Sequence, residues 1–175
     1  MKIKESVEPQ RIPLPRVEGF NCFACGSENP IGLKMKFYME GNIVGTDITL
    51  GKNHVGWEHM AHGGIIATLL DEVMSWAALA LTREFIVTRK METHFLRPVI
   101  VEQPINLQAR ILERSKKGCL VEGLLFGADG KKSARANAEM IFLTKKRIDA
   151  MPFSLKEATL NIFKEMEALT KNCDE

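Results

Sequence analysis

The pattern of apolar and polar positions predicts one long helix over residues 63–82. Apolar side chains recur there at intervals of three and four residues, which is the spacing of one face of a helix. The main stripe is Ile65, Leu69, Val73, Trp76 and Ala80, and Ile66, Leu70, Ala77 and Leu81 widen it. A helix that is apolar around most of its surface is buried. The acidic pair Asp71-Glu72 within it therefore stands out.

Alternating patterns on both sides of this helix predict strands. Two strands, about 33–39 and 43–50, are joined by the tight-turn pair Gly41-Asn42. From residue 86 onward the period switches to two, with strands ending near 97, 111, 126 and 144. Turns are expected at Lys117-Gly118 and, as a type I′ turn, at Asp129-Gly130. These signals predict that the second half is an antiparallel meander of four strands.

The two ends of the chain have a different character. Residues 1–20 carry three prolines and no period, so they are predicted to form an extended arm, followed by a loop to residue 32. Residues 51–61 are interpreted as a loop that is long enough to have a functional role. Near the other end, Ser154-Leu155-Lys156-Glu157 has the form of a capping box before an amphipathic helix. Its apolar stripe is Leu155, Thr159, Ile162, Phe163, Met166 and Leu169.

The order of elements predicts the fold class. One apolar helix followed by one antiparallel sheet implies an α+β fold in which the sheet wraps around that helix. The sequence divides into an N-terminal arm and cysteine-containing loop (1–32), a central domain (33–145) and a C-terminal helix (146–175).

Composition narrows the classes of function. The chain has 175 residues, with 45% apolar and 26% charged side chains, as is typical of a globular domain with a real core. A net charge of +2 gives no argument for nucleic acid. No apolar run approaches the ~20 residues of a membrane span. Met1 to Glu8 lacks the apolar region of a secretory signal, and four cysteines make no dense disulfide framework. We therefore expect a cytoplasmic protein.

The candidate chemistry lies at the start of the long helix. The glycines of His62-Gly63-Gly64 open the helix, and its first N–H groups favour an oxyanion. Glycine leaves no Cβ between the backbone and a bound group. Asp71 follows Gly64 by seven residues, so the two share a helical face, with Thr68 between them. This combination suggests hydrolysis or proton transfer at a carbonyl.

Other polar residues allow alternatives. Glu72 points about 100° away from Asp71 and is expected to face a different partner. His54, His59 and His62 do not match a standard zinc spacing, and hydrogen-bonded loop histidines are favoured. His94 is interpreted as structural or as an interface residue.

The cysteines are interpreted mainly as structural. Cys22 and Cys25 have the spacing of half a zinc site, whose other half would need Cys119, Cys173 or histidines. A redox pair normally starts a helix beside a βαβ unit, which this chain lacks. A tight buried loop is favoured over both zinc and redox chemistry, so no metal is predicted.

At this point the residues resemble a known family. The order of elements, with His62-Gly63-Gly64, Thr68-Leu69-Leu70-Asp71, the later Thr88 and Phe95-Leu96-Arg97-Pro98, resembles the hotdog-fold thioesterases of the PaaI-like group. Cys22-Phe23-Ala24-Cys25-Gly26, followed by Asn29-Pro30-Ile31-Gly32-Leu33, is similar to the openings of some members. The resemblance covers about residues 20–145.

The resemblance implies a homodimer or dimer of dimers, an active site between subunits, an acyl-coenzyme A substrate and no cofactor. Asp71 would be the nucleophile or the general base that activates water. The Gly63 N–H would stabilise the oxyanion, and His62 would shape the oxyanion loop. Thr88 would position water or the carboxylate from the partner subunit. The resemblance also suggests substrate-binding residues, which are Gly64, Asn53, His54, Thr68 and Arg97.

Thioester hydrolysis suits these residues because it needs only water, a base and an oxyanion donor. Two alternatives stay open. A hydratase or dehydratase would pair His62 or His59 with Asp71 or Glu72, and a non-catalytic acyl-CoA sensor would bind without turnover. Trp57 and Trp76 would belong to the core or to an acyl pocket. Basic residues that could meet coenzyme A phosphates are Arg89, Lys90, Lys116, Lys117, Lys131, Lys132, Lys145, Lys146 and Arg147.

Overall fold

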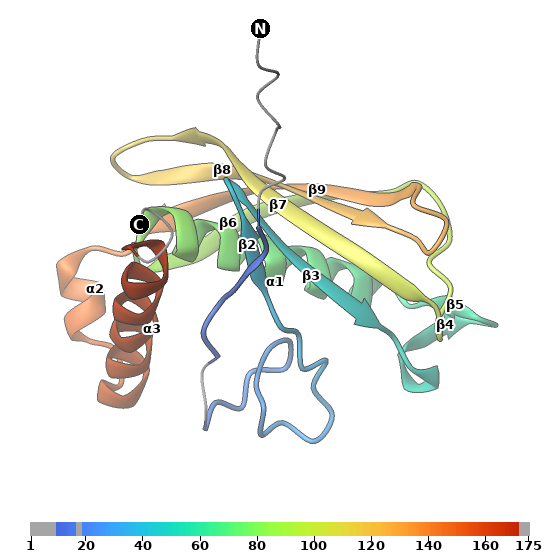
Figure 1. Ribbon diagram of the computed structural model, residues 1–175, viewed down its shortest axis with the longest axis horizontal. Coiled ribbons are helices and arrows are strands. Elements are labelled where there is room, and N and C mark those ends of the chain that lie inside the picture. Colours follow the sequence, from blue (N-terminus) through green and yellow to red (C-terminus); the bar gives the residue numbers. More distant parts are fainter. Residues whose placement is uncertain (1–9, 17–18, 172–175) are drawn as a thin grey trace, which may run out of the picture.

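A curved antiparallel sheet lies over one long helix, α1 (Gly63–Thr82), in the computed structural model (Figure 1). The structure describes residues 10–16 and 19–171. The expectations for Met1 to Glu8 and for Cys173 lie outside these residues. The predicted α+β fold, with one sheet around one central helix and a second helix at the C-terminal end, is confirmed.

The main sheet has seven strands in the order β1-β2-β3-β7-β8-β9-β6. Its strands are β1 (Ile12–Pro13), β2 (Tyr38–Glu40), β3 (Ile43–Thr49), β6 (Ile86–Phe95), β7 (Pro104–Arg114), β8 (Gly118–Phe126) and β9 (Lys132–Phe142). A separate hairpin consists of β4 (Val55–Trp57) and β5 (Met60–Ala61), preceded by the short helix η1 (Lys52–His54). The chain ends with α2 (Lys145–Asp149) and α3 (Phe153–Lys171).

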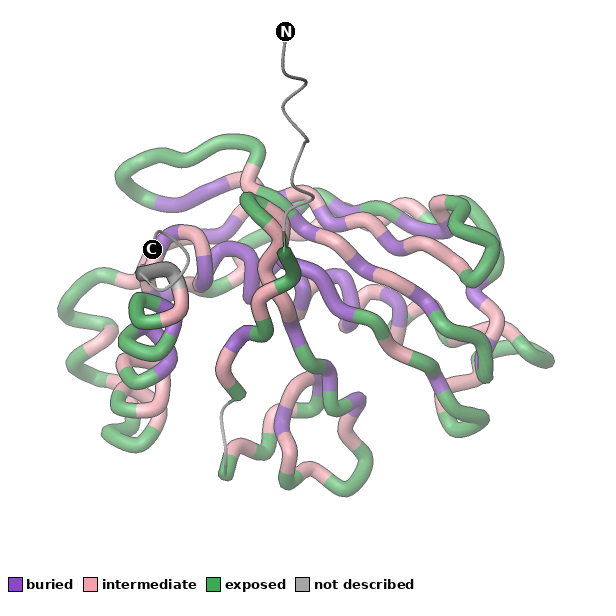
Figure 2. The backbone as a smooth tube through the Cα atoms, in the orientation of Figure 1, coloured by how far each residue is buried: buried purple, intermediate pink, exposed green. Residues whose placement is uncertain are grey.

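Helix α1 has the predicted bounds because a capping residue lies at each end. His62 caps its N-terminus, and Arg83 ends it in the left-handed region, where its N–H donates to the Leu79 carbonyl. Leu69, Leu70 and Val73 are fully buried against the sheet. Figure 2 shows the same pattern, with buried residues concentrated on the helix and on the strands above it. This packing, more than helix propensity, holds α1 in place.

The sequence expectation about membranes needs one correction. Helix α1 is long and apolar enough, by length and composition alone, to cross a membrane. In this structure it is instead the core helix, and its apolar side chains fill the space under the sheet.

The prediction of a four-stranded meander is wrong. Strands β7, β8 and β9 are consecutive neighbours, but β6 pairs with β9 and β7 pairs with β3. Period-two alternation identifies a strand and does not identify its neighbour. The connection after β6 leads the chain from one edge of the sheet to β7, which lies between β3 and β8. Strands β3 and β6 therefore lie on opposite sides of the β7-β8-β9 meander, and both contact α1, so the sheet wraps the helix.

Two local predictions in the first half of the chain have different outcomes. The Gly41-Asn42 turn is confirmed, with Glu40 opposite Ile43 and Gly41 at φ 58°. The strand predicted over residues 33–39, however, begins at residue 38. Lys34 adopts a φ of 55°, and Leu33 and Met35 instead donate to carbonyls of the preceding cysteine-containing loop.

In the second half, the turn at Asp129-Gly130 is present but its predicted type I′ geometry is wrong, and the predicted capping box is also wrong. The β8–β9 connection spans residues 127–131, and only Gly130 of the predicted type I′ pair has a positive φ, at 71°. Helix α3 begins at Phe153, where the Pro152 carbonyl accepts from the N–H groups of residues 155 and 156. Ser154 therefore lies within the first turn and does not cap the helix.

Helix α3 packs beside the end of α1 through its predicted apolar stripe. Ile162, Phe163 and Met166 are buried, and the ring of Phe163 meets that of Phe85 edge-on at a centroid distance of 5.6 Å. An apolar cavity of about 340 Å³ lies among α1, α3 and the start of β6. The C-terminal helix thus forms one wall of a cavity beside Glu72.

Candidate active site

A hydrogen-bonded pair of side chains lies between α1 and the neighbouring strand β6. The Thr88 hydroxyl donates to Oδ1 of Asp71 at 2.8 Å, and both residues are half-buried. This bond restrains the orientation of the Asp71 side chain, and within residues 10–16 and 19–171 its second carboxylate oxygen accepts no hydrogen bond. The structure brings together two of the predicted catalytic residues within one chain.

The local structure of β6 explains why Thr88 faces the helix. Strand β6 follows α1 after a short turn, so the two run in opposite directions and in contact. Its pairing with β9 shifts between Thr88 and Lys90, which marks a β-bulge. A bulge inserts one residue and changes which side chains face inward. Before it Ile86 and Thr88 face inward, and after it Met91 does.

The other candidate group lies at the first turn of α1. Nδ1 of His62 accepts a hydrogen bond from the Gly64 N–H at 3.0 Å, so His62 caps the helix with its side chain. The N–H groups of Ile65 and Ile66 donate to the His62 carbonyl. Across residues 10–16 and 19–171, no acceptor is present for the Gly63 N–H. Gly63 therefore presents the free amide, and Gly64 does not.

The space around Gly63 and Gly64 shows whether packing requires glycine at these two positions. A Cβ at position 63 would meet the Phe95 ring at 3.5 Å, which is ordinary contact, so packing within the chain does not require glycine there. A Cβ at position 64 would lie 3.1 Å from Nδ1 of His62, its own capping partner. Glycine at position 63 instead keeps the amide open to a bound group.

The Gly63 amide borders a cavity of about 530 Å³. Its walls come from the β4–β5 hairpin and from residues 95–99, and they include Trp57, Phe95 and Leu96. Trp57 is 72% exposed, so it belongs to a surface wall and not to the core. Trp76, in contrast, is buried and stacks on Phe37 at a centroid distance of 4.8 Å.

The two parts of the site are too far apart to act together within one chain. Gly63 and Asp71 are separated by eight residues of α1, which is about 12 Å of helical rise. A reacting carbonyl needs its oxygen and its carbon each within about 3 Å of the acting groups. One thioester therefore cannot contact both groups of the same chain.

The remaining predicted substrate residues have structural partners. The Thr68 hydroxyl donates to the Gly64 carbonyl at 2.9 Å, which keeps it on its own helix. Nδ1 of His54 accepts from the Gly51 N–H at 3.1 Å, and Asn53 is exposed in η1. Arg97 lines the cavity at Gly63 but donates to the Lys132 carbonyl at 2.9 Å.

The histidines do not form the pair that a hydratase would need. His94 lies 2.9 Å from Glu92 on β6, and His59 is exposed. In the part of the chain that the structure describes, no histidine side chain bonds to Asp71 or Glu72. Within one chain, the structure thus separates the groups that the hydratase alternative would combine.

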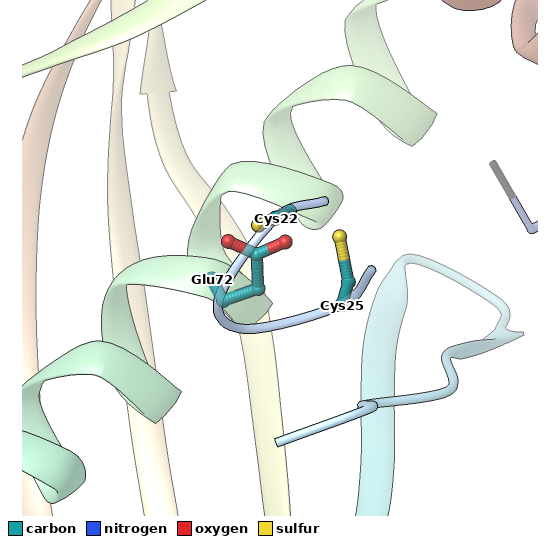
Figure 3. A group of neighbouring side chains, drawn as sticks. All are labelled: Cys22, Cys25 and Glu72. Carbon is teal, nitrogen blue, oxygen red and sulfur yellow. The ribbon is translucent and has the colours of Figure 1, made fainter. Parts of the chain in front are cut away.

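A second cluster, which the sequence did not predict, lies next to Asp71. Cys22, Cys25 and Glu72 place their sulfur and carboxylate oxygen atoms within 4.8 Å of one another (Figure 3). Nε1 of Trp76 donates to Glu72 at 3.2 Å. The Cys22-x2-Cys25 spacing was a signal, but only the tertiary structure supplies Glu72 as the third group.

This cluster has unusual electrostatics. Burial raises the pKa of Glu72 to about 7. A hydrogen bond with the Cys25 thiol, together with backbone N–H groups of residues 24–26, lowers the pKa of Cys22. The same side-chain hydrogen bond and burial raise the pKa of Cys25.

Comparison with known proteins gives a family match over 77 of the 175 residues. Residues 58–134 match the family model of the Thioesterase superfamily. This segment contains α1, β6, β7, β8 and the start of β9, and hence Gly63, Asp71 and Thr88. Together with the sheet around a central helix, the match confirms the resemblance to the hotdog-fold thioesterase superfamily.

Particular relatives agree with this class. The fold matches the Escherichia coli PaaI protein of the phenylacetic acid degradation operon at a TM-score of 0.60, with 16% identity over 64% of this chain and 81% of that one. It also matches a hypothetical thioesterase from Streptococcus pneumoniae, solved with coenzyme A, at a TM-score of 0.57, with 16% identity over 60% and 81%. Verlamelin biosynthesis protein B of Lecanicillium is 27% identical, over 55% of this chain and 54% of that protein. The chain therefore spans about half the length of this curated relative.

Proposed function

We propose that this protein is an acyl-CoA thioesterase, which hydrolyses an acyl-coenzyme A to a carboxylic acid and coenzyme A. The observation that carries the proposal is the Asp71 carboxylate, held by Thr88 at 2.8 Å on a helix whose Gly63 amide has no acceptor in the described chain. A base and an oxyanion donor are the two groups that thioester hydrolysis requires.

In this reaction the oxygen of water ends on the carbonyl carbon, and the bond from that carbon to sulfur breaks. Asp71 takes a proton from the attacking water, or attacks the carbon itself and is then released by water. The thiolate of coenzyme A leaves and is protonated. The Gly63 N–H stabilises the oxyanion that forms on the carbonyl oxygen, an effect worth roughly 10²–10³ in rate for one donor.

The proposed site is shared between two chains. Because about 12 Å of helix separates Gly63 from Asp71, Asp71 of one chain would act with Gly63 of the partner subunit. Strand β6 supports this arrangement, since it is an edge strand of ten residues that carries Thr88. Long exposed edge strands favour pairing with another chain. We therefore propose a homodimer or a dimer of dimers.

The substrate class follows from the family and from the walls of the site. A thioesterase-superfamily neighbour was solved with coenzyme A. A largely apolar cavity lies at Gly63, and it suits an acyl chain. We also propose a cytoplasmic location, because Cys22, Cys25 and Cys119 are free thiols.

Thiol release from a panel of acyl-CoAs tests the proposal. The wild-type chain is expected to release free coenzyme A, and Asp71→Asn is expected to lose this activity while it keeps its fold by circular dichroism. Asp149→Asn is the matched control, because that carboxylate lies at the end of α2 and bonds Lys156. Binding of acyl-CoA without turnover would indicate a sensor. Addition of water to an enoyl-CoA would indicate a hydratase.

A further inference from the structure

Two thiols and one carboxylate converge from distant parts of the chain, outside the proposed thioester site. Cys22 and Cys25 lie on the N-terminal loop, and Glu72 lies on α1, where it points toward them (Figure 3). Their ligand atoms are all within 4.8 Å of one another. All three residues are half-buried.

The loop that carries the two thiols is held in one conformation. The Gly26 N–H donates to the Cys22 carbonyl at 3.0 Å. A Cβ at Gly26 would lie 2.4 Å from the Phe20 carbonyl oxygen and 2.5 Å from the Cys22 nitrogen, so only glycine fits this turn. Further hydrogen bonds, from Leu33 to Phe23 and from Met35 to Ala24, tie both sides of the loop to the following segment. The two sulfur atoms are therefore presented together on a preformed turn.

The carboxylate that meets these thiols has no cationic side chain as a partner. In the described chain, Glu72 forms no ion pair with lysine or arginine, and its side-chain hydrogen-bond partners are the Trp76 N–H and the Cys25 thiol. A buried carboxylate is costly unless a cation or several hydrogen bonds compensate for its charge. Two cysteines and an acid without a cation are a donor set that a metal ion would complete.

We propose that Cys22, Cys25 and Glu72 bind a zinc ion. Zinc prefers four ligands drawn from thiolate, imidazole and carboxylate, whereas magnesium and calcium prefer oxygen ligands alone. Bringing the three atoms to zinc bonding distances, about 2.3 Å for sulfur and 2.0 Å for oxygen, needs only small contraction of the cluster. Water, or a ligand in the adjoining cavity of about 340 Å³, takes the fourth position.

The zinc ion would fasten the N-terminal loop to the core helix. Glu72 is the neighbour of Asp71 in the sequence, so the ion would also fix the turn of α1 that carries the proposed catalytic carboxylate. The two thiol ligands lie outside residues 58–134, the segment matched by the thioesterase family model. The proposal concerns a structural site and assigns zinc no step in thioester hydrolysis.

Cobalt(II) titration of the whole reduced, metal-free chain tests the site, because cobalt–thiolate absorption in the near ultraviolet reports sulfur ligands. We expect saturation at one cobalt per chain and displacement of the signal by zinc. Glu72→Gln should weaken binding by more than about tenfold, and Cys25→Ser by at least as much. The matched controls are Cys119→Ser, at a buried thiol on β8, and Glu165→Gln, on the exposed face of α3. Both controls should bind as the wild type does.

A measurement on the wild-type chain avoids any folding defect of the variants. Zinc should slow alkylation of Cys22 and Cys25, located by mass spectrometry, and leave Cys119 unchanged. The proposal is overturned if the wild type gives no cobalt–thiolate absorption, or if zinc protects neither Cys22 nor Cys25. An unchanged cobalt affinity in Glu72→Gln would remove Glu72 from the ligand set and overturn the proposed site. None of these results depends on thioesterase activity.

Discussion

Thr88 donates a hydrogen bond of 2.8 Å to the Asp71 carboxylate from the neighbouring strand of the same chain. The bond restricts the acid to one orientation and keeps its second oxygen available. Because Thr88 lies directly before a β-bulge, the strand can direct this hydroxyl at the helix and still bury Met91 further along. The bulge therefore positions the proposed base.

Removal of this hydroxyl should lower the rate of thioester hydrolysis without unfolding the chain. A hydrogen bond to a charged group is worth about 1.5–3 kcal/mol, so we expect Thr88→Val to reduce kcat by about 10- to 100-fold. Thr88→Ser keeps the donor and should retain most of the activity. Steady-state kinetics with one acyl-CoA checks both. Equal losses in the two variants would contradict the positioning role.

Replacement of Gly63 by proline should remove the oxyanion donor and preserve the helix. Position 63 is the first residue of α1, where proline is well tolerated, and His62 already has the extended backbone that precedes proline, at φ −62° and ψ 135°. We expect Gly63→Pro to lower kcat by roughly 10²–10³. Gly63→Ala keeps the N–H, and its methyl group would meet Phe95 at an ordinary 3.5 Å. If the proline variant matched the alanine variant in kcat, this amide would not be the donor.

A mixture of two inactive variants should recover activity if the site is shared. In a dimer of one Asp71→Asn chain and one Gly63→Pro chain, one site carries both substitutions and the other carries neither. Subunit exchange followed by thiol-release assays should therefore reveal activity that neither variant has alone. Size-exclusion chromatography with light scattering would confirm that dimers are present. Absence of recovery in verified mixed dimers would contradict a site built from Gly63 of one chain and Asp71 of the other.

Shortening a buried side chain on the core helix should destabilise the whole domain. Leu70 is fully buried between α1 and the sheet, so we expect Leu70→Ala to lower the free energy of unfolding by about 2–5 kcal/mol. Ile31 is 73% exposed, and Ile31→Ala should change it by less than about 0.5 kcal/mol. Urea denaturation measures both. A small loss at Leu70 would show that the helix does not carry the core.

The sequence by itself determined the helix and its bounds, and it predicted the chemistry at the start of the helix. The apolar period over residues 63–82 leaves few other structures, because a helix apolar on most sides must be buried. The pairing of β6 with β9 could not be predicted from the sequence, since the alternation of apolar and polar residues does not specify which strand lies next to which. The resemblance suggested that Thr88 would position water or the carboxylate of the partner subunit, and the structure instead bonds Thr88 to Asp71 of the same chain.

Only the tertiary structure decided two further points. It showed that the Gly64 N–H donates to the His62 side chain, whereas the Gly63 N–H has no acceptor in the described chain. The sequence cannot show this, because capping geometry depends on a side-chain rotamer. The tertiary structure also brought Glu72 to Cys22 and Cys25, although the sequence had supplied only half of such a site. Local patterns specify which residues form an element and which face is apolar. Contacts between residues distant in the chain depend on how those faces pack together, and no single segment contains that information.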